Sequence, residues 1–218
     1  YSKALECDNK TIELARNQGD TTRLILSLFQ MGSTNIEANK LEEGAKILKG
    51  ILTDFDSSRL GPYLQIINTN IGVAYIEQEN YIEGLKYTFK AVNPDKKDIS
   101  YYITLSNIAE SYLKLIEEGY PDAEIPRFQQ LNQLEVANNP QKTIEEIAVD
   151  YCIESINGFE QLNNDRYQVY PLSGLATYHK NKNNPSQALN YYQQAYNIAE
   201  RNDLLTEQIG RASCRERV

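Results

Sequence analysis

Residues 31–44 are Met-Gly-Ser-Thr-Asn-Ile-Glu-Ala-Asn-Lys-Leu-Glu-Glu-Gly, and residues 71–84 are Ile-Gly-Val-Ala-Tyr-Ile-Glu-Gln-Glu-Asn-Tyr-Ile-Glu-Gly. Both stretches hold an apolar residue before Gly, then Ile-Glu, then a closing Glu-Gly, and matching positions are 40 residues apart. Self-similarity with a period of about 20 to 50 residues is typical of arrays in which one supersecondary unit stacks on the next. The sequence therefore predicts a repeat array and not a single globular core.

Small residues extend this pattern along the chain. Each predicted unit has one early in its second helix: Ala4, Gly44, Gly84, Ala148 and Ala188. A small residue there lets the second helix approach the first closely, and a larger apolar residue one turn later fills the remaining gap. Three of the intervals are 40 residues and one is 64. The longer interval predicts an insertion of about 24 residues, placed at 119–142.

Helical periodicity and turn residues place the helices. We expect a second helix at 2–17, helix pairs at 21–38 with 41–54, 61–78 with 81–92, 98–118 with 141–162 and 166–182 with 185–201, and a further first helix from about 203. Within the insertion, residues 126–136 are expected to form one short amphipathic helix. Its apolar side carries Phe128, Leu131 and Leu134. That helix either contacts a partner or folds back over the edge of its own repeat.

The predicted first helices carry a recognisable motif: an apolar residue, a small one, and an aromatic residue three positions later. The motif is complete at Ile71-Gly72-x2-Tyr75 and Ile108-Ala109-x2-Tyr112, and its first two positions recur at Met31-Gly32 and Leu175-Ala176. The chain thus resembles a tetratricopeptide repeat (TPR) protein, although Leu28, Asn68, Leu105 and Leu172 stand where that family usually has Trp. The resemblance implies an all-α fold, a right-handed α-solenoid of antiparallel helix pairs. It divides residues 1–208 into a partial repeat at 1–20 and repeats at about 25–58, 65–98, 102–163 and 169–202.

The inner wall of such an array is formed by the first helices, and the resemblance implies that it binds the partner. Its inward positions are Phe29, Ser33, Ile36, Thr69, Val73, Ile76, Ser106, Glu110, Leu113, Ser173, Thr177 and Lys180. The Lys, Arg and Asn set with which some members of the family clamp a peptide's terminal carboxylate is not present at these positions. Alternatively, the apolar members of the first two groups only pack between helices.

The 40-residue period is similar to that of arrays attached to bacterial sensor histidine kinases and helix-turn-helix regulators. We therefore expect a protein-binding scaffold, the sensory or docking part of a larger bacterial signalling protein, whose partner is a protein, a peptide or a second copy of the chain. The alternative is a peptide or small-molecule receptor that changes superhelical shape on binding. The compartment stays open between the cytoplasm and, for a sensor kinase, the periplasm.

The two ends of the chain have unusual sequences. The first residue is Tyr1 and the only Met is Met31, so we expect that the natural N-terminus is missing. Residues 209–218 resemble one reading frame of a common sequencing adaptor, and we expect them to be a non-native tail. Without their three Arg and one Glu, the formal net charge changes from −8 to −10.

Composition and spacing exclude several classes of site. Acidic and basic residues are interspersed at a net charge of −8, which argues against a nucleic-acid surface. No apolar run approaches the roughly 20 residues of a membrane span. Cys7, Cys152 and Cys214 are far apart, so neither a zinc site nor a disulfide framework is indicated, and no cofactor motif is present.

Catalytic chemistry is not predicted either. His179 is the only histidine and occupies the aromatic position of its motif, where a packing role is expected. Cys152 lies where a second helix needs a small apolar filler, and a reactive thiol would require a cationic neighbour. We therefore expect no enzyme, no metal site and no cofactor in this segment.

Overall fold

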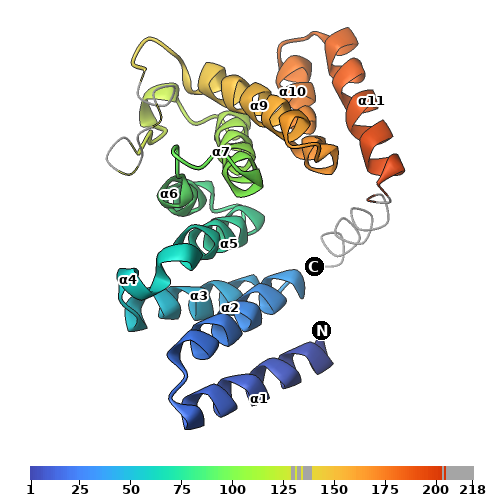
Figure 1. The fold of residues 1–218 in the computed structure, drawn as a ribbon. Helices are drawn as coiled ribbons and strands as arrows, with labels where there is room; N and C mark the ends of the chain where they lie inside the picture. The colour runs from blue at the N-terminus through green and yellow to red at the C-terminus, as the bar shows by residue number, and fades with distance from the viewer. Residues whose placement is uncertain (129–130, 132–133, 135–138, 203, 205–218) are drawn as a thin grey trace. The chain divides into compact units, whose positions relative to one another are not determined.

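The computed structural model describes residues 1–128, 131, 134, 139–202 and 204, and every regular element among them is a helix (Figure 1). Helices adjacent in sequence pack against each other in pairs, so the predicted all-α fold is confirmed for this part of the chain. The chain divides into two compact units. Unit 1 consists of residues 1–95 and 123–134, and unit 2 consists of residues 96–122 and 135–218.

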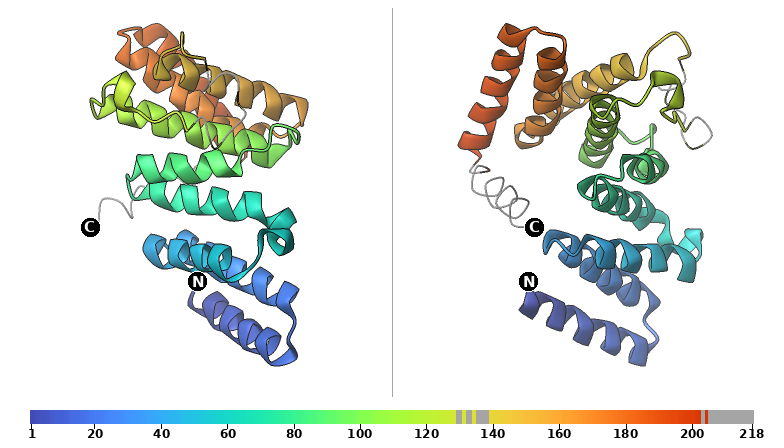
Figure 2. Two further views of the ribbon diagram at one scale, coloured as in Figure 1. Left: turned by 90° about the vertical axis from the view of Figure 1, so that its left-hand side faces the viewer. Right: turned by 180° about the vertical axis from the view of Figure 1, so that it is seen from behind.

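Unit 1 is a stack of helices in chain order. It contains α1 (Ser2–Gln18), α2 (Thr21–Glu37), α3 (Leu41–Asp54), α4 (Ser57–Leu60), the 3-10 turn η1 (Gly61–Tyr63), α5 (Leu64–Glu77) and α6 (Tyr81–Ala91). α1, α2, α3 and α5 lie side by side in both views of Figure 2, and α6 packs on α5. Each long helix thus buries its apolar stripe against the helices next to it in sequence, as stacked repeats do.

Unit 2 is built around one long helix pair. It contains α7 (Ile99–Glu117), α9 (Ile144–Gln161), the 3-10 turn η4 (Asp165–Gln168), α10 (Val169–Asn181) and α11 (Pro185–Arg201). The division between the two units falls within the 3-10 turn η2 (Asp122–Glu124). α7 packs on α9, α10 packs on both, and α11 packs on α10.

Tight turns with a left-handed residue reverse the chain between helices. The residues with positive φ at these helix ends are Gly19, Asn39, Glu79, Gly119, Asn163 and Asn183. A side chain that caps the next helix often follows at once. Asp20 accepts a hydrogen bond from the backbone N–H of Arg23 at 2.9 Å, and Asn80 accepts one from that of Glu83 at 3.4 Å. Because the connection is so short, the two helices that it joins are antiparallel.

Two first helices begin differently from the prediction. α5 begins at Leu64 instead of 61, because α4 and the 3-10 turn η1 occupy residues 57–63. α10 begins at Val169 instead of 166, after the turn η4. The predicted further helix from about 203 and the tail 209–218 lie outside the described residues apart from Leu204, which packs against the cluster around Val169 and Leu172.

Close contact at glycines explains the repeated small residue. A Cβ atom on Gly44 would lie 2.7 Å from the carbonyl oxygen of Gly32 and 2.6 Å from Cγ1 of Ile36. One on Gly84 would lie 2.7 Å from Cγ1 of Ile76. Real Cβ atoms do not approach other heavy atoms this closely, so the predicted tight approach of paired helices is confirmed at both positions.

The other small residues differ in their burial. Ala148 and Ala188 are buried in unit 2, as expected. Ala4 is exposed, and because it is predicted to pack on a first helix that would precede α1, its packing role stays a prediction. α1 uses Ile12 and Ala15 as its buried residues instead, which lie nearer the turn into α2.

Part of the predicted insertion packs with the repeats that precede it in sequence and not with the repeat in which it was placed. Residues 123–134 belong to unit 1, where Ile125 and Leu134 are buried and the rings of Phe128 and Phe89 lie 5.8 Å apart. A helix was predicted at 126–136, but its first three residues, Pro126 to Phe128, are not helical, and Phe128 has a φ of 47°. Residues 129–130, 132–133 and 135–136 of that predicted helix lie outside the described residues.

We expect Gly44→Ala to lower the free energy of unfolding by about 1–3 kcal/mol, because the added methyl group meets backbone that cannot move aside. Gly50→Ala in the same helix is the matched control. Its Cβ would meet nothing within 4 Å, so Ala should raise stability by about 0.5–1 kcal/mol through its higher helix propensity. Urea unfolding followed by circular dichroism measures both. Equal effects of the two substitutions would contradict the tight approach.

Replacing residues 123–138 with a short Gly-Ser linker should leave the helical content nearly unchanged, because none of the described residues in this range lies in a long helix. Stability should fall by about 3–6 kcal/mol, since two buried apolar side chains are lost at roughly 1.5–3 kcal/mol each. Far-ultraviolet circular dichroism and urea unfolding provide the measurement. Complete loss of helicity would show that the segment is an integral layer of the array.

Candidate binding site

A hollow of about 210 Å³ opens between α7 and α10 within unit 2. α7 contributes Ser106, Glu110, Leu113, Lys114 and Glu117. These positions follow one another at intervals of three or four residues, apart from the adjacent pair 113 and 114, so a regular helix brings them all to one side.

The opposite wall and the floor come from α10 and α9. α10 contributes Tyr170, Pro171, Ser173, Gly174 and Thr177, and α9 contributes Cys152. A Cβ on Gly174 would lie 3.1 Å from Sγ of Cys152 and 3.4 Å from Cδ1 of Leu113. The missing side chain of Gly174 therefore lets α10 close the floor against both other helices.

The frame that holds α7 against α9 is densely bonded. Glu154 on α9 accepts hydrogen bonds from Nζ of Lys97 at 2.9 Å and from the hydroxyl of Tyr101 at 3.1 Å. Burial and the charge of Glu154 raise the pKa of Tyr101, which stays a neutral donor. Ser155 donates to the carbonyl oxygen of Tyr102 at 3.1 Å. These bonds fix the α7 wall of the hollow relative to its floor.

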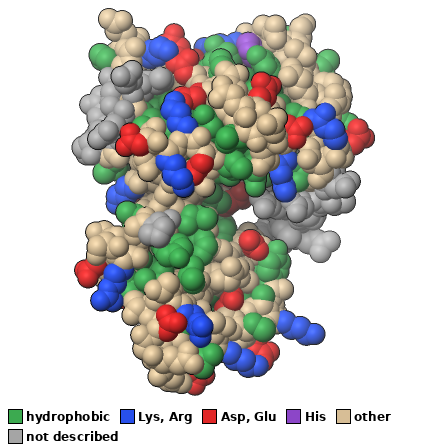
Figure 3. Space-filling model, viewed as in Figure 1, with side chains coloured by type: hydrophobic (Ala, Val, Ile, Leu, Met, Phe, Trp, Pro, Cys, Tyr) green, Lys and Arg blue, Asp and Glu red, His purple; other side chains and the backbone are tan. Residues whose placement is uncertain are grey.

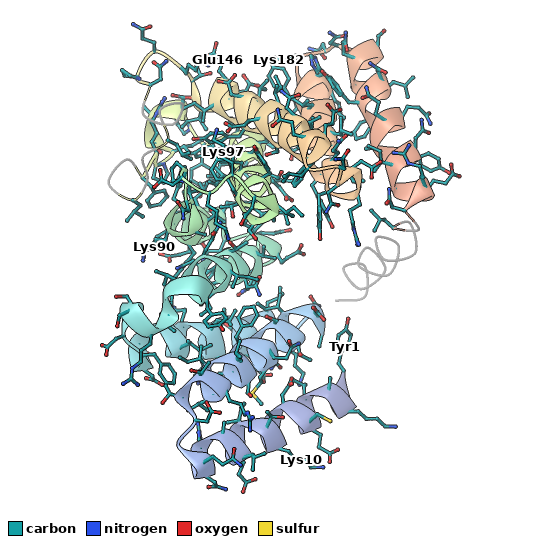
Figure 4. The ribbon with its side chains drawn as sticks, in the orientation of Figure 1. Tyr1, Lys10, Lys90, Lys97, Glu146 and Lys182 are labelled. Atoms are coloured by element: carbon teal, nitrogen blue, oxygen red, sulfur yellow. The ribbon has the colours of Figure 1, made fainter. Side chains whose placement is uncertain are left out.

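Further contacts are made at the N-terminal turn of α9, where it lies near the C-terminal end of α10. Thr143 and Glu146 form a capping box, and the Lys182 ammonium pairs with Glu145 at 2.6 Å. Glu146 and Lys182 lie at the same end of unit 2 (Figure 4). α9 and α10 are thus tied together beyond the hollow, which limits how far the walls can separate.

The serine and threonine hydroxyl groups of the hollow present acceptors. Ser106 donates to the carbonyl of Tyr102 at 3.0 Å, Ser173 to that of Val169 at 2.8 Å, and Thr177 to that of Ser173 at 3.0 Å. Each hydroxyl has one proton, and these three use it on the preceding turn of their own helix. Only oxygen lone pairs are left for a group that enters from outside.

Charge at the rim is predominantly negative. Glu110 and Glu117 are both exposed there, and among the described residues of the lining Lys114 is the basic one. The Lys114 ammonium pairs with the Glu117 carboxylate at 2.7 Å. Burial, together with the charge of Glu110, raises the pKa of the Cys152 thiol to about 12.

Two tyrosines stand beside the hollow. Tyr170 lines it and is 50% exposed. The hydroxyl of Tyr192 on α11 lies 3.4 Å from that of Thr177, and Tyr192 is itself 41% exposed. Aromatic rings with an exposed face are common anchors for peptide side chains.

Five of the twelve inward positions inferred from the resemblance lie around this hollow: Ser106, Glu110, Leu113, Ser173 and Thr177. Lys180 is exposed one turn beyond Thr177 and does not line it. Six residues line it without having been predicted as site residues: Lys114, Glu117, Cys152, Tyr170, Pro171 and Gly174. Continuing the helical spacing by one turn, from Leu113 to Glu117 and from Ser173 back to Tyr170, would have found two of them.

The six positions in unit 1 contribute mainly to packing. Phe29 and Ile36 pack against the core cluster around Ile25 and Leu48, and Thr69 and Ile76 are buried. Two positions, Ser33 and Val73, are half-buried, and Ser33 accepts a hydrogen bond from Asn70 at 2.9 Å. A binding role for these six residues stays a prediction.

His179, the only histidine of the chain, lies in an aromatic cluster. The ring of His179 stacks on Tyr191 with 5.4 Å between centroids, which is a packing role. Within the described ranges, no group of three or more His, Cys, Asp or Glu residues could hold a metal ion, and no helix is long and apolar enough to cross a membrane. Acidic and basic side chains are intermingled on the face drawn in Figure 3.

We expect the Cys152 thiol to react with iodoacetamide at pH 8 more slowly than that of exposed Cys7, by on the order of a hundredfold or more. Its high pKa leaves little thiolate, and it is only 1% exposed. Peptide mass spectrometry at several times separates the two sites. Similar rates at both cysteines would mean that the floor of the hollow opens readily.

No protein-family model matches the sequence, and no curated protein is similar enough to count as a relative. The fold and the hollow are therefore the observations from which a function can be inferred.

Proposed function

We propose that this chain is a tetratricopeptide-type repeat array that binds a segment of a partner protein in the hollow between α7 and α10. The observation that carries the proposal is the hollow itself. It combines a rigid frame, apolar surface from Leu113 and Pro171, and polar acceptors on two facing helices. Peptide sites on helical scaffolds have this mixed character, because apolar contact supplies affinity and placed polar groups supply selectivity.

The size of the hollow favours a peptide side chain over a cofactor. Its volume of about 210 Å³ is below the roughly 300–1,000 Å³ of pockets that enclose drug-sized ligands. One side chain with its flanking backbone fits such a space, whereas most of a larger small molecule would stay in solvent. A docking role within a larger bacterial signalling protein follows from the same resemblance and belongs to this proposal.

A peptide library tests the function directly. Linear peptides displayed on phage are selected on the immobilised chain, and dissociation constants of the resynthesised peptides are measured by fluorescence anisotropy. We expect Ser173→Trp to weaken binding about tenfold or more, because the indole fills the hollow that a bound side chain needs. Ser186→Trp, at an exposed position of α11, is the matched control and should leave the affinity unchanged.

Folding of the variants is checked by thermal melting. If Ser173→Trp fails to fold, Thr177→Trp fills the same hollow from the next turn of α10. Peptides that bind every correctly folded hollow variant as tightly as the unaltered chain would show that the site lies elsewhere. Failure to select any peptide would overturn the proposed function itself.

A further inference from the structure

α11 lies at the edge of unit 2, where it packs mainly on α10 and the turn η4 (Figure 1). Its buried residues are Ala188, Ala195, Ile198 and Ala199. Three large side chains of the same helix are exposed: Leu189 by 68%, Tyr192 by 41% and Tyr196 by 49%. They are three and four residues apart and therefore form one stripe along the helix, which we call the α11 stripe.

The equivalent positions are buried in the other second helices. Four residues after the small residue of each repeat, α3, α6 and α9 bury Leu48, Thr88 and Cys152. One residue after it, α3 and α6 bury Ala45 and Leu85. α11 has Tyr192 and Leu189 at these two positions and buries neither. The stripe thus occupies positions that the rest of the array covers.

Later parts of the chain pack on each of those other second helices. α5 packs on α3, Phe128 contacts Phe89 of α6, and α10 packs on α9. The described residues that follow α11 are Asn202 and Leu204. Leu204 packs on a cluster that contains none of the three stripe residues. Among the described residues, α11 is therefore the second helix on which no later element is stacked.

α11 also lacks charge over most of its length. Residues 185–199 contain no Asp, Glu, Lys, Arg or His, although charged residues make up 24% of the chain. α5 is similarly poor in charge, and helices α3 and α6 both pack on it. A helix that faces water usually carries charged residues on its outer side. Few charges and exposed aromatic residues are typical of the core of a protein interface.

A stripe without charge suits pairing with an identical copy. An interface about a two-fold axis brings each group near the axis against the same group of the other copy, so a charge there would face its like. The spacing of the stripe also matches itself in the antiparallel direction, because Leu189 and Tyr196 lie on either side of Tyr192. Leu189 of one copy then meets Tyr196 of the other, and the two Tyr192 rings meet near the axis.

Glu200 at the end of the helix favours the antiparallel direction. It is exposed, and its carboxylate accepts a hydrogen bond from the hydroxyl of Tyr196 at 3.4 Å, so it lies beside the stripe. In a parallel pair the two Glu200 carboxylates would face each other. In an antiparallel pair each lies near the first turn of the other α11, where the helix dipole favours a negative charge.

We propose that two copies of this chain associate through an antiparallel pair of α11 helices, about a two-fold axis near Tyr192. α11 has 17 residues and is about 25 Å long, so one helix pair covers less area than the roughly 1,200–2,000 Å² of stable interfaces. The dimer is therefore weak, with a dissociation constant on the order of 0.1 mM. This inference is separate from the peptide site, since no stripe residue lines the hollow.

Sedimentation equilibrium of the whole chain measures the association, at concentrations from about tenfold below to about tenfold above the expected dissociation constant. A reducing buffer prevents disulfides through exposed Cys7. Leu189→Glu should raise the dissociation constant about tenfold or more, because the new charge is buried against Tyr196 of the other copy. Asn190→Glu, an equal charge change at an exposed position of α11 outside the stripe, is the matched control and should leave it unchanged.

A charge exchange tests the direction of the helices. Tyr196→Lys alone should also weaken the dimer. Combined with Leu189→Glu in one chain, it places opposite charges against each other twice in the antiparallel pair. The double variant should therefore associate about threefold or more tightly than either single variant. In a parallel pair each new charge would face its like, and the double variant would be the weakest.

Circular dichroism verifies that the variants are folded, and Tyr192→Glu replaces Leu189→Glu if that variant does not fold. A chain that stays monomeric over the whole concentration range overturns the proposal, whatever covers the stripe. So does a dimer that Leu189→Glu leaves unchanged, because its interface would lie elsewhere. A double variant no tighter than the single variants overturns the antiparallel pairing. None of these outcomes affects the proposed function, because peptide binding in the hollow is measured separately.

Discussion

The close approach of paired helices at small residues is the constraint on which the rest of the structure depends. Gly32 and Gly44 bring the backbones of α2 and α3 so near that a Cβ on Gly44 would meet a carbonyl oxygen at 2.7 Å. A slightly wider contact recurs between α5 and α6, where a Cβ on Gly84 would lie 3.3 Å from the carbonyl oxygen of Gly72. Helices this close can bury larger residues such as Leu48 and Ile76 beside the contact, so one repeated glycine fixes both separation and register.

The hollow of unit 2 arises from a variation of this packing. Gly174 lets α10 close on α9 and α7. The neighbouring lining residues of α10, Tyr170, Ser173 and Thr177, do not fill the space between the walls. Below the hollow, bonds from Glu154 and Ser155 hold α7 and α9 together. A tight floor and incompletely filled walls together produce a rigid space that is open to solvent.

Unit 1 uses equivalent positions differently. Ile36 and Ile76 press against the glycines of the following helix, and Phe29 packs on the core cluster. The inserted residues add to this core, since Ile125 and Leu134 are buried and Phe128 contacts Phe89. Positions that the family resemblance treats as equivalent are therefore apolar packing residues in one unit and a polar lining in the other.

The sequence by itself determined the helical class, the helix order and most helix bounds, because these depend on local periodicity, caps and turn residues spaced by a constant interval. The 40-residue spacing also identified Gly44 and Gly84 as contact points, and the resemblance to tetratricopeptide repeats implied five residues that line the hollow. The sequence could not place the insertion, because the partner of Phe128 is Phe89, a residue distant in sequence. Only the tertiary structure decided that Glu117, Tyr170 and Gly174 line one hollow. It also decided that the serine and threonine protons of the hollow are already used. Hydrogen-bond direction and the gap between two helices depend on three-dimensional packing and not on any local pattern.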